Sequence, residues 1–206
     1  RLEKTRNLEE IVNTLISFVK EGKIKQFGFS EIAPTTLEKI SAIYPVGAIQ
    51  SEYSLSTRYP ELGLVQRTKK LNTSLVAFSP VGRGLLTDNP IDENLVPSLP
   101  FLKQNPRFSQ NNYAANIKAC EGFRSLAKNL NLTAAGLAIA WLHNKGKHIL
   151  TIPGTRSVNH FVEMANGANK KLSSEQMSEI EKVLPIGWAH GDRYSQEQWL
   201  GPEKYC

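Results

Sequence analysis

Residues 149–157 read ILTIPGTRS, an apolar run that stops at Pro153-Gly154 and leads into a helical pattern from Val158 to Met164. A short apolar run ended by Pro-Gly predicts a buried β-strand followed by a turn. The free N–H groups and the dipole of the next helix favour an anion at its start, and Arg156 adds a bidentate donor for phosphate. The stretch therefore predicts a strand–turn–helix unit that binds a phosphorylated ligand.

The same strand-then-helix pattern recurs along the chain. Short, largely apolar runs predict strands at 23–29, 46–49, 74–78 and 148–152. Helical spacing of apolar residues predicts helices at 8–21, 34–43, 62–71, 114–129, 133–144, 158–166 and 174–184. This alternation favours right-handed crossovers and a parallel α/β sheet. We expect its strands to be buried on both faces, with ligand-binding residues at their carboxyl ends.

Two segments lack this pattern. The polar, Pro-rich stretch 87–112 is long for a loop in a compact domain, and such loops are typically functional lids or disordered. The aromatic tail 185–206 either borders a substrate pocket or packs as a C-terminal strap. No linker composition divides the chain, so residues 1–206 are predicted to form a single domain.

The composition is that of an ordinary soluble globular domain. The 206 residues are 40% apolar and 21% charged, and no window approaches the roughly 18 apolar residues of a membrane span. The net charge of +6 comes from lysines and arginines spread over predicted helices, which favours solvated helix faces over a nucleic-acid site. Neither a membrane nor a nucleic acid is therefore an expected partner.

The cysteines and histidines suggest no crosslink or metal site. Cys120 and Cys206 are the only cysteines and make no disulfide framework, which favours a reducing, cytoplasmic setting. The four histidines have no metal-ligand spacing, so no metal is predicted. No signal-peptide pattern is present. Because residue 1 is Arg rather than Met, we expect the chain to be a fragment or a processed product.

Polar and glycine residues follow each predicted strand, in the sets Ser30-Glu31, Gln50 with Tyr53, 78–84 and 153–156. Because the carboxyl ends of parallel strands meet at one face, these sets are expected to converge. The Gln50 amide suits a carboxamide and the ring at position 78 suits a heteroaromatic ring. The two glycines within 78–84 allow a pyrophosphate to approach the backbone.

Each residue also has a plainer explanation. Gly82 and Gly84 fit a tight turn, and Phe78 fits the core. The Gln50 amide fits the satisfaction of buried backbone groups, and Glu31 fits a helix cap.

No motif supplies a complete catalytic centre. Tyr53, Glu31 and Glu52 are the only strand-end candidates for a general acid or base, and none has a Lys or His partner in the sequence. Ser-His-Asp, P-loop and GxGxxG signatures are absent as well. No catalytic residue is therefore assigned.

Seven motifs, in order and spacing, resemble the aldo-keto reductase family over nearly the whole chain. They are VKEGKI at 19–24, GFSE at 28–31, QSEYSL at 50–55, AFSPVGRGLLT at 77–87, PRF at 106–108, LAIAWL at 137–142 and IPGTR at 152–156. The second and third resemble the bacterial and fungal subgroup that includes pyridoxal reductases. The resemblance implies a (β/α)8 TIM barrel that uses NADPH, or sometimes NADH, to reduce aldehydes and ketones.

The resemblance also implies roles for particular residues. The carboxamide of the nicotinamide would bind Ser30 and Gln50, with Glu31 in place of the commoner Asn, and Phe78 would stack on the ring. Residues 79–84 would line the pyrophosphate. Thr155 and Arg156 would hold the 2′-phosphate. His160 stands where many members have Arg, and Met164 stands in place of an Asn that contacts adenine. The implied cofactor-binding residues are Ser30, Glu31, Gln50, Phe78, Ser79, Pro80, Val81, Gly82, Arg83, Gly84, Pro153, Gly154, Thr155, Arg156, His160 and Glu163.

The family's catalytic Asp, Tyr, Lys and His all precede the helix expected at 8–21. The chain thus resembles the C-terminal half of the barrel, strands five to eight, without the N-terminal half. A half barrel leaves two sheet edges and an apolar interior uncovered. We therefore expect it to be inactive alone and to need the missing N-terminal half, self-association or a rearranged packing.

The predicted function is an NADPH-dependent oxidoreductase that transfers a hydride to a small-molecule carbonyl substrate. One alternative is a non-catalytic NADPH-binding pseudo-enzyme or regulatory module. Another is a different phosphate-binding barrel, such as an isomerase or aldolase.

Overall fold

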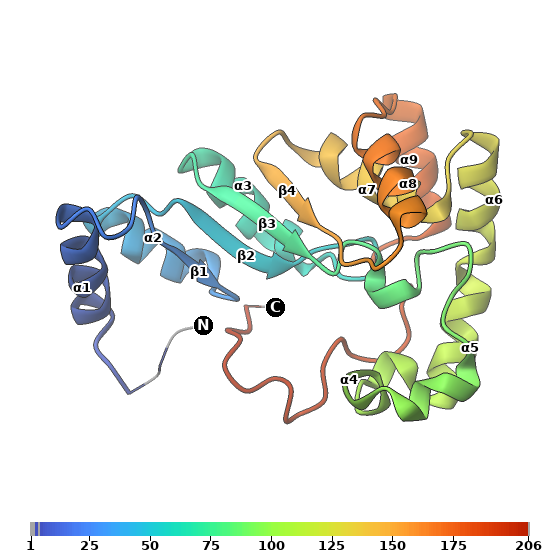
Figure 1. Cartoon of the computed structure of the whole chain (residues 1–206), viewed down its shortest axis with the longest axis horizontal. Helices are drawn as coiled ribbons and strands as arrows, with labels where there is room; N and C mark the ends of the chain where they lie inside the picture. Colours follow the sequence, from blue (N-terminus) through green and yellow to red (C-terminus); the bar gives the residue numbers. More distant parts are fainter. Residues whose placement is uncertain (1–2, 4, 206) are drawn as a thin grey trace.

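A computed structural model describes residue 3 and residues 5–205 (Figure 1). Its sheet contains β1 (Gly28–Ser30), β2 (Ala48–Glu52), β3 (Ser74–Phe78) and β4 (Ile149–Ile152). All neighbouring strands are parallel, and their spatial order is β1-β2-β3-β4. The predicted parallel α/β sheet is confirmed, and β1 and β4 form its two edges.

Helices connect the strands, as the alternating pattern predicts. The α-helices are α1 (Leu8–Lys20), α2 (Pro34–Ile43), α3 (Leu64–Lys70), α4 (Pro100–Lys103), α5 (Gln110–Ala119), α6 (Glu121–Asn129), α7 (Ala134–Lys145), α8 (Val158–Ala168) and α9 (Ser174–Val183). Short 3-10 helices are η1 (Tyr59–Leu62), η2 (Gly82–Gly84), η3 (Glu93–Ser98) and η4 (Pro106–Phe108).

Only one face of the sheet is fully covered. Ile49, Leu75 and Ile149 are in register across three strands and are buried in the main core with α7. On the other face Gln50 is exposed, and Leu150 is 50% exposed. The expected burial on both faces is therefore wrong, because the described helices pack against a single face and leave the other open.

Two strands differ from their predicted bounds by more than one residue. The run at 23–29 forms a strand only from Gly28, because the pairing with β2 begins there. The strand expected at 46–49 continues to Glu52, since Ser51 and Glu52 pair with the end of β3. This extension places Glu52 at the carboxyl end of the sheet.

The stretch 87–112 is not a plain loop. It contains η3, α4 and η4, and α5 begins at Gln110. Pro100 and Pro106 each lie in the first turn of a helix, where the missing N–H costs no hydrogen bond. These turns pack around a small core of Leu85, Val96, Leu102, Phe108 and Tyr113. The helix expected at 114–129 is divided at Cys120 into α5 and α6.

The tail after α9 contains no helix or strand among its described residues, and it crosses the carboxyl ends of the strands toward β1 (Figure 1). It is fixed there by Glu203, whose carboxylate accepts from the Ala33 amide at 2.7 Å and whose own amide donates to the Glu31 carbonyl at 2.8 Å. Across the described part of the chain, no helix has the length and apolar character needed to cross a membrane.

Candidate functional site

A first hollow of about 540 Å³ lies at the carboxyl ends of β1, β2 and β3. Its wall includes predicted residues from three strand ends, Ser30, Gln50, Phe78, Ser79 and Arg83. The remaining wall comes from Phe101 and Leu102 of α4 and from Tyr194 of the tail. Strand ends that are far apart in the sequence thus meet in one cavity.

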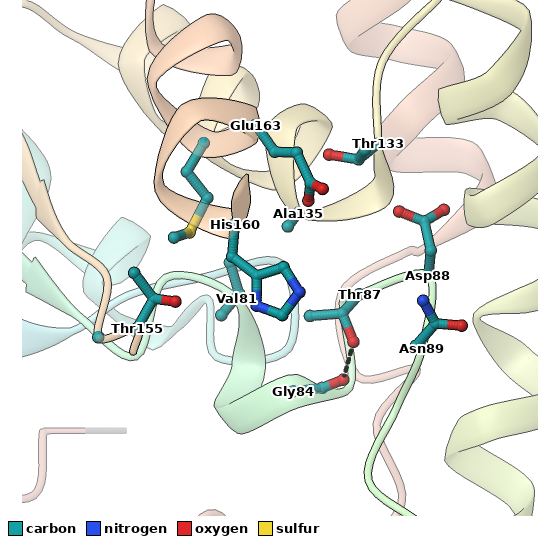
Figure 2. Close-up of a pocket in the computed structure, with 12 residues that line it drawn as sticks. Val81, Gly84, Thr87, Asp88, Asn89, Thr133, Ala135, Thr155, His160 and Glu163 are labelled. Carbon is teal, nitrogen blue, oxygen red and sulfur yellow. Dashed lines mark hydrogen bonds between the residues drawn. The ribbon is translucent and has the colours of Figure 1, made fainter. Parts of the chain in front are cut away.

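A second hollow, of about 350 Å³, lies between η2, β4 and the amino ends of α7 and α8. The predicted residues that line it are Val81, Gly84, Gly154, Thr155, His160 and Glu163. The other lining residues are Thr87, Asp88, Asn89, Thr133, Ala135 and Met164. Figure 2 shows the His160 imidazole extending into this space, with the carboxylates of Glu163 and Asp88 on its borders.

A single turn separates the two hollows. Ser79 and Arg83 line the first, whereas Val81 and Gly84 line the second. The turn has a positive φ at Ser79 (50°), Gly82 (60°), Arg83 (57°) and Gly84 (98°). A Cβ on Gly82 would also lie 3.0 Å from the Ser56 hydroxyl, so this backbone position requires glycine.

Five predicted residues line neither hollow. Pro80 and Gly82 belong to the turn and are buried. Pro153 lines a mainly apolar hollow between β4 and α8, and Arg156 is exposed beside Thr155. Glu31 is 3% exposed and belongs to a buried network of charges.

The network joins two carboxylates to two guanidinium groups. The Glu31 carboxylate accepts from Ser51 Oγ at 3.0 Å, from the Glu52 amide at 2.9 Å and from Arg193 Nη2 at 2.5 Å. The Glu52 carboxylate accepts from Arg83 Nη2 at 2.6 Å and from Arg193 Nη1 at 3.1 Å. Both carboxylates are thus held by protein donors.

The sequence candidates for a general acid or base are therefore occupied. Besides the two carboxylates, Tyr53 donates to Glu61 Oε1 at 2.8 Å, and burial together with the Glu61 charge raises the pKa of its hydroxyl. The ionisable side chains that line the first hollow, among the described residues, are Arg83 and Tyr194. Burial raises the pKa of Tyr194. The described part of the chain holds no cluster of three or more potential metal ligands.

The sequence placed Arg193 and Tyr194 in the tail that either borders a substrate pocket or packs as a strap, but it did not predict their contacts. They lie in the irregular tail, where no periodicity assigns a face, and Arg193 meets Glu31 from 162 residues away. The available signal was the density of aromatic residues around them. Tyr59, Tyr194 and Trp199 lie with their ring centroids 4.4–4.5 Å from the guanidinium carbon of Arg193, as cation–π contacts.

Comparisons with known proteins give consistent matches. The sequence model of the Aldo/keto reductase family matches residues 1–185. Probable aldo-keto reductase 1 of Glycine max is 37% identical over 194 residues, covering 94% of this chain and 56% of that protein. The aldo-keto reductase yakc of Schizosaccharomyces pombe, whose name includes NADP(+), is 33% identical over 190 residues, with coverages of 91% and 56%.

Two solved structures share the fold. The glycerol dehydrogenase AKR11B4 from Gluconobacter oxydans superposes with a TM-score of 0.76 at 21% identity, over 89% of this chain and 56% of that one. The thermostable aldo-keto reductase Tm1743, solved with the inhibitor epalrestat, gives 0.66 at 25% identity, over 88% and 56%. The chain thus spans about half the length of the relatives it matches.

Proposed function

Because the chain belongs to the aldo/keto reductase family, we propose that it is the half of a (β/α)8 barrel that contains strands five to eight. Its four parallel strands follow in sequence order, and no further strand among the described residues pairs with the edge strands β1 and β4. One sheet face is open, and its relatives are nearly twice as long. An N-terminal segment would supply the other strands, so residues 1–206 would be part of a single domain.

NADPH is the proposed ligand, bound across both hollows. One observation carries this proposal: the turn 79–84 lines the first hollow on one side and the second on the other, so an extended dinucleotide can contact both. The groups that line the two hollows fit such a molecule. The first hollow offers an aromatic ring and an amide, and the turn offers backbone in the left-handed region.

Each part of the dinucleotide has proposed contacts. Ser30 and Gln50 bind the carboxamide, and Phe78 stacks on the nicotinamide ring. Residues 79–84 line the pyrophosphate. The adenosine half lies in the second hollow near His160 and Glu163, and its 2′-phosphate meets Thr155 and the exposed Arg156.

The proposed reaction is the reduction of a small aldehyde or ketone. Bound NADPH supplies the hydride. The role of this chain is to orient the nicotinamide ring on Phe78 and to border the substrate space with Phe101, Leu102 and Tyr194. The proton donor would come from the N-terminal half, because the strand-end carboxylates and Tyr53 are engaged by other groups. That engagement also favours a second candidate, a module that binds NADPH without turnover.

A titration tests the cofactor proposal. NADPH is added to the 206-residue chain while tryptophan fluorescence is followed, with ribose 5-phosphate as the control. Quenching by NADPH alone supports a dinucleotide site. An equal response to both ligands would favour an isomerase-like or aldolase-like phosphate site, and no response to NADPH would contradict the proposal.

Two further observations test the half-barrel proposal. The gene sequence upstream of Arg1 should encode Asp, Tyr, Lys and His in that order. The 206-residue chain with NADPH should not reduce carbonyl compounds, and reduction at ordinary enzyme rates would show that the chain needs no other half.

A further inference from the structure

The Arg193 side chain ties the tail to the carboxyl ends of two strands. It is 3% exposed, and its two terminal nitrogens donate to Glu31, which follows β1, and to Glu52, which ends β2. Aromatic rings of Tyr59, Tyr194 and Trp199 surround the guanidinium. This residue therefore fixes where the tail crosses the sheet.

The same residue also fixes Arg83, on the wall of the first hollow. Arg83 Nη2 and Arg193 Nη1 share one carboxylate oxygen, Glu52 Oε2. Arg83 Nη1 donates to the Arg193 carbonyl at 3.0 Å, and Asn105 Nδ2 donates to that carbonyl at 2.5 Å. The guanidinium of Arg83 is thus held at both terminal nitrogens, by Glu52, which the Arg193 side chain also binds, and by the Arg193 main-chain carbonyl.

Tyr194 extends the connection into the cavity. It follows Arg193 directly and lines the first hollow beside α4, where its ring centroid lies 6.3 Å from that of Phe101. Its ring centroid lies 5.2 Å from the guanidinium carbon of Arg83, and the Phe101 ring lies 5.0 Å from the same carbon. Two walls of the hollow, Arg83 and Tyr194, therefore have one common support.

One donor of the Arg193 guanidinium is left without a partner in the part of the chain that the structure describes. Arg193 Nε is buried and has no hydrogen-bond partner among the described residues. A buried donor left unpaired costs stability. The contacts of Arg193 thus fix a position at some cost to the folded state.

We propose that Arg193 is a positioning residue for the cofactor, through which the ordered tail holds Arg83 and Tyr194 in place around the nicotinamide. This inference rests on the proposed NADPH site and adds a coupling between tail and ligand. On this proposal, binding of the nicotinamide half of the dinucleotide depends on Arg193, and binding of the adenosine half does not. The second hollow contains neither Arg193 nor a residue bonded to it.

The test compares two ligands on two tail variants. Arg193→Gln removes the ion pairs with Glu31 and Glu52. Glu203→Gln is the matched control, because it weakens the other tail anchor, at Ala33 and Thr36, without touching either hollow. We expect Arg193→Gln to weaken NADPH binding by about tenfold, because Arg83 and Tyr194 are then held less firmly around the nicotinamide.

The fragment 2′,5′-ADP separates positioning from general damage, because it lacks the nicotinamide. Its affinity should be unchanged in Arg193→Gln and in Glu203→Gln. Equal weakening of NADPH and 2′,5′-ADP would overturn the proposal, as would equal effects of the two variants on NADPH. If Arg193→Gln folds poorly, Arg193→Lys takes its place. This variant keeps the charge with fewer donors and should give an NADPH affinity between those of wild type and a variant without the charge.

Hydrogen exchange tests the same coupling without a ligand. The amides of Gly82 and Leu86 are bonded within the turn, to the carbonyls of Ser79 and Val81. They should exchange faster in Arg193→Gln than in Glu203→Gln, and equal exchange would overturn the proposal. If the wild-type chain fails to bind NADPH while this difference is present, the proposed function fails and the structural coupling stands.

Discussion

Gly136 of α7 and Gly167 of α8 face each other where the two helices cross, with no side chain between their backbones. A Cβ on Gly167 would overlap the backbone of Gly136, and a Cβ on Gly136 would lie 3.1 Å from the Glu163 carbonyl. The close crossing brings Thr133 and Ala135 of the α7 end to the same hollow as His160 and Glu163. It therefore shapes the adenosine side of the proposed site.

Gly167→Ala should separate these helices. We expect a loss of about 1–3 kcal/mol in the free energy of unfolding, because overpacking of a close interface forces backbone shifts. Urea denaturation measures the loss. Gly154→Ala is the matched control, since a Cβ there meets nothing within 4 Å. Equal stability of the two variants would show that the crossing tolerates a methyl group.

A second prediction concerns Arg58, which joins η1 to α9. Its side chain is 6% exposed and pairs with Glu61 at 2.7 Å and with Glu181 at 3.0 Å. Arg58→Met should cost about 2 kcal/mol in urea denaturation, less than a fully buried pair, because water reaches both carboxylates. Arg67→Met provides the comparison and should cost under about 1 kcal/mol, because its partner Glu38 is exposed. Similar losses for the two variants would contradict the buried role of Arg58.

A third prediction concerns acid stability. Burial lowers the pKa of His143, whose Nε2 lies 3.0 Å from Thr151 Oγ1 of β4. A lowered histidine pKa means that the unfolded chain binds the proton more tightly. The contribution of neutral His143 to the free energy of unfolding is therefore complete above the unfolded-state pKa of about 6.5, and it is lost as the pH falls below that value. Urea midpoints between pH 7.5 and pH 5 should fall less in His143→Gln than in wild type, and parallel curves would rule out this contribution.

Much of the fold follows from local sequence pattern. β3 has the predicted bounds, 74–78, because its apolar run 75–78 is bounded by polar residues on both sides. The helix expected at 174–184 from apolar spacing is α9, and the structure shows that it begins with a capping box in which Ser173 and Gln176 are bonded reciprocally. The strand ends then specify most of the candidate site, since a parallel sheet brings its carboxyl ends together.

The contacts that could not be predicted from the sequence either join residues far apart in the chain or depend on the absence of a side chain. Arg193 lies in a segment without periodicity, and nothing local relates it to Glu31 or Glu52. Gly136 and Gly167 appear in the sequence as helix-weakening residues, and their role depends on the crossing of α7 and α8. The strand pattern alone predicted burial on both faces, because apolar strands do not specify what covers them, whereas the half-barrel resemblance implied an uncovered interior.

The last prediction concerns the preference for NADPH over NADH. Arg156 is exposed beside Thr155 at the entrance to α8, where its guanidinium is available to the proposed 2′-phosphate. Arg156→Gln should weaken NADPH binding about tenfold, as expected for one charged hydrogen bond to phosphate, and leave NADH unchanged. Lys147 lies just before β4, at the end of that strand opposite to Arg156. Lys147→Gln therefore removes one positive charge away from the proposed site and controls for the overall electrostatic field of the protein. If both variants weaken NADPH equally, the effect is long-range attraction by the net charge of +6, and Arg156 does not contact the 2′-phosphate.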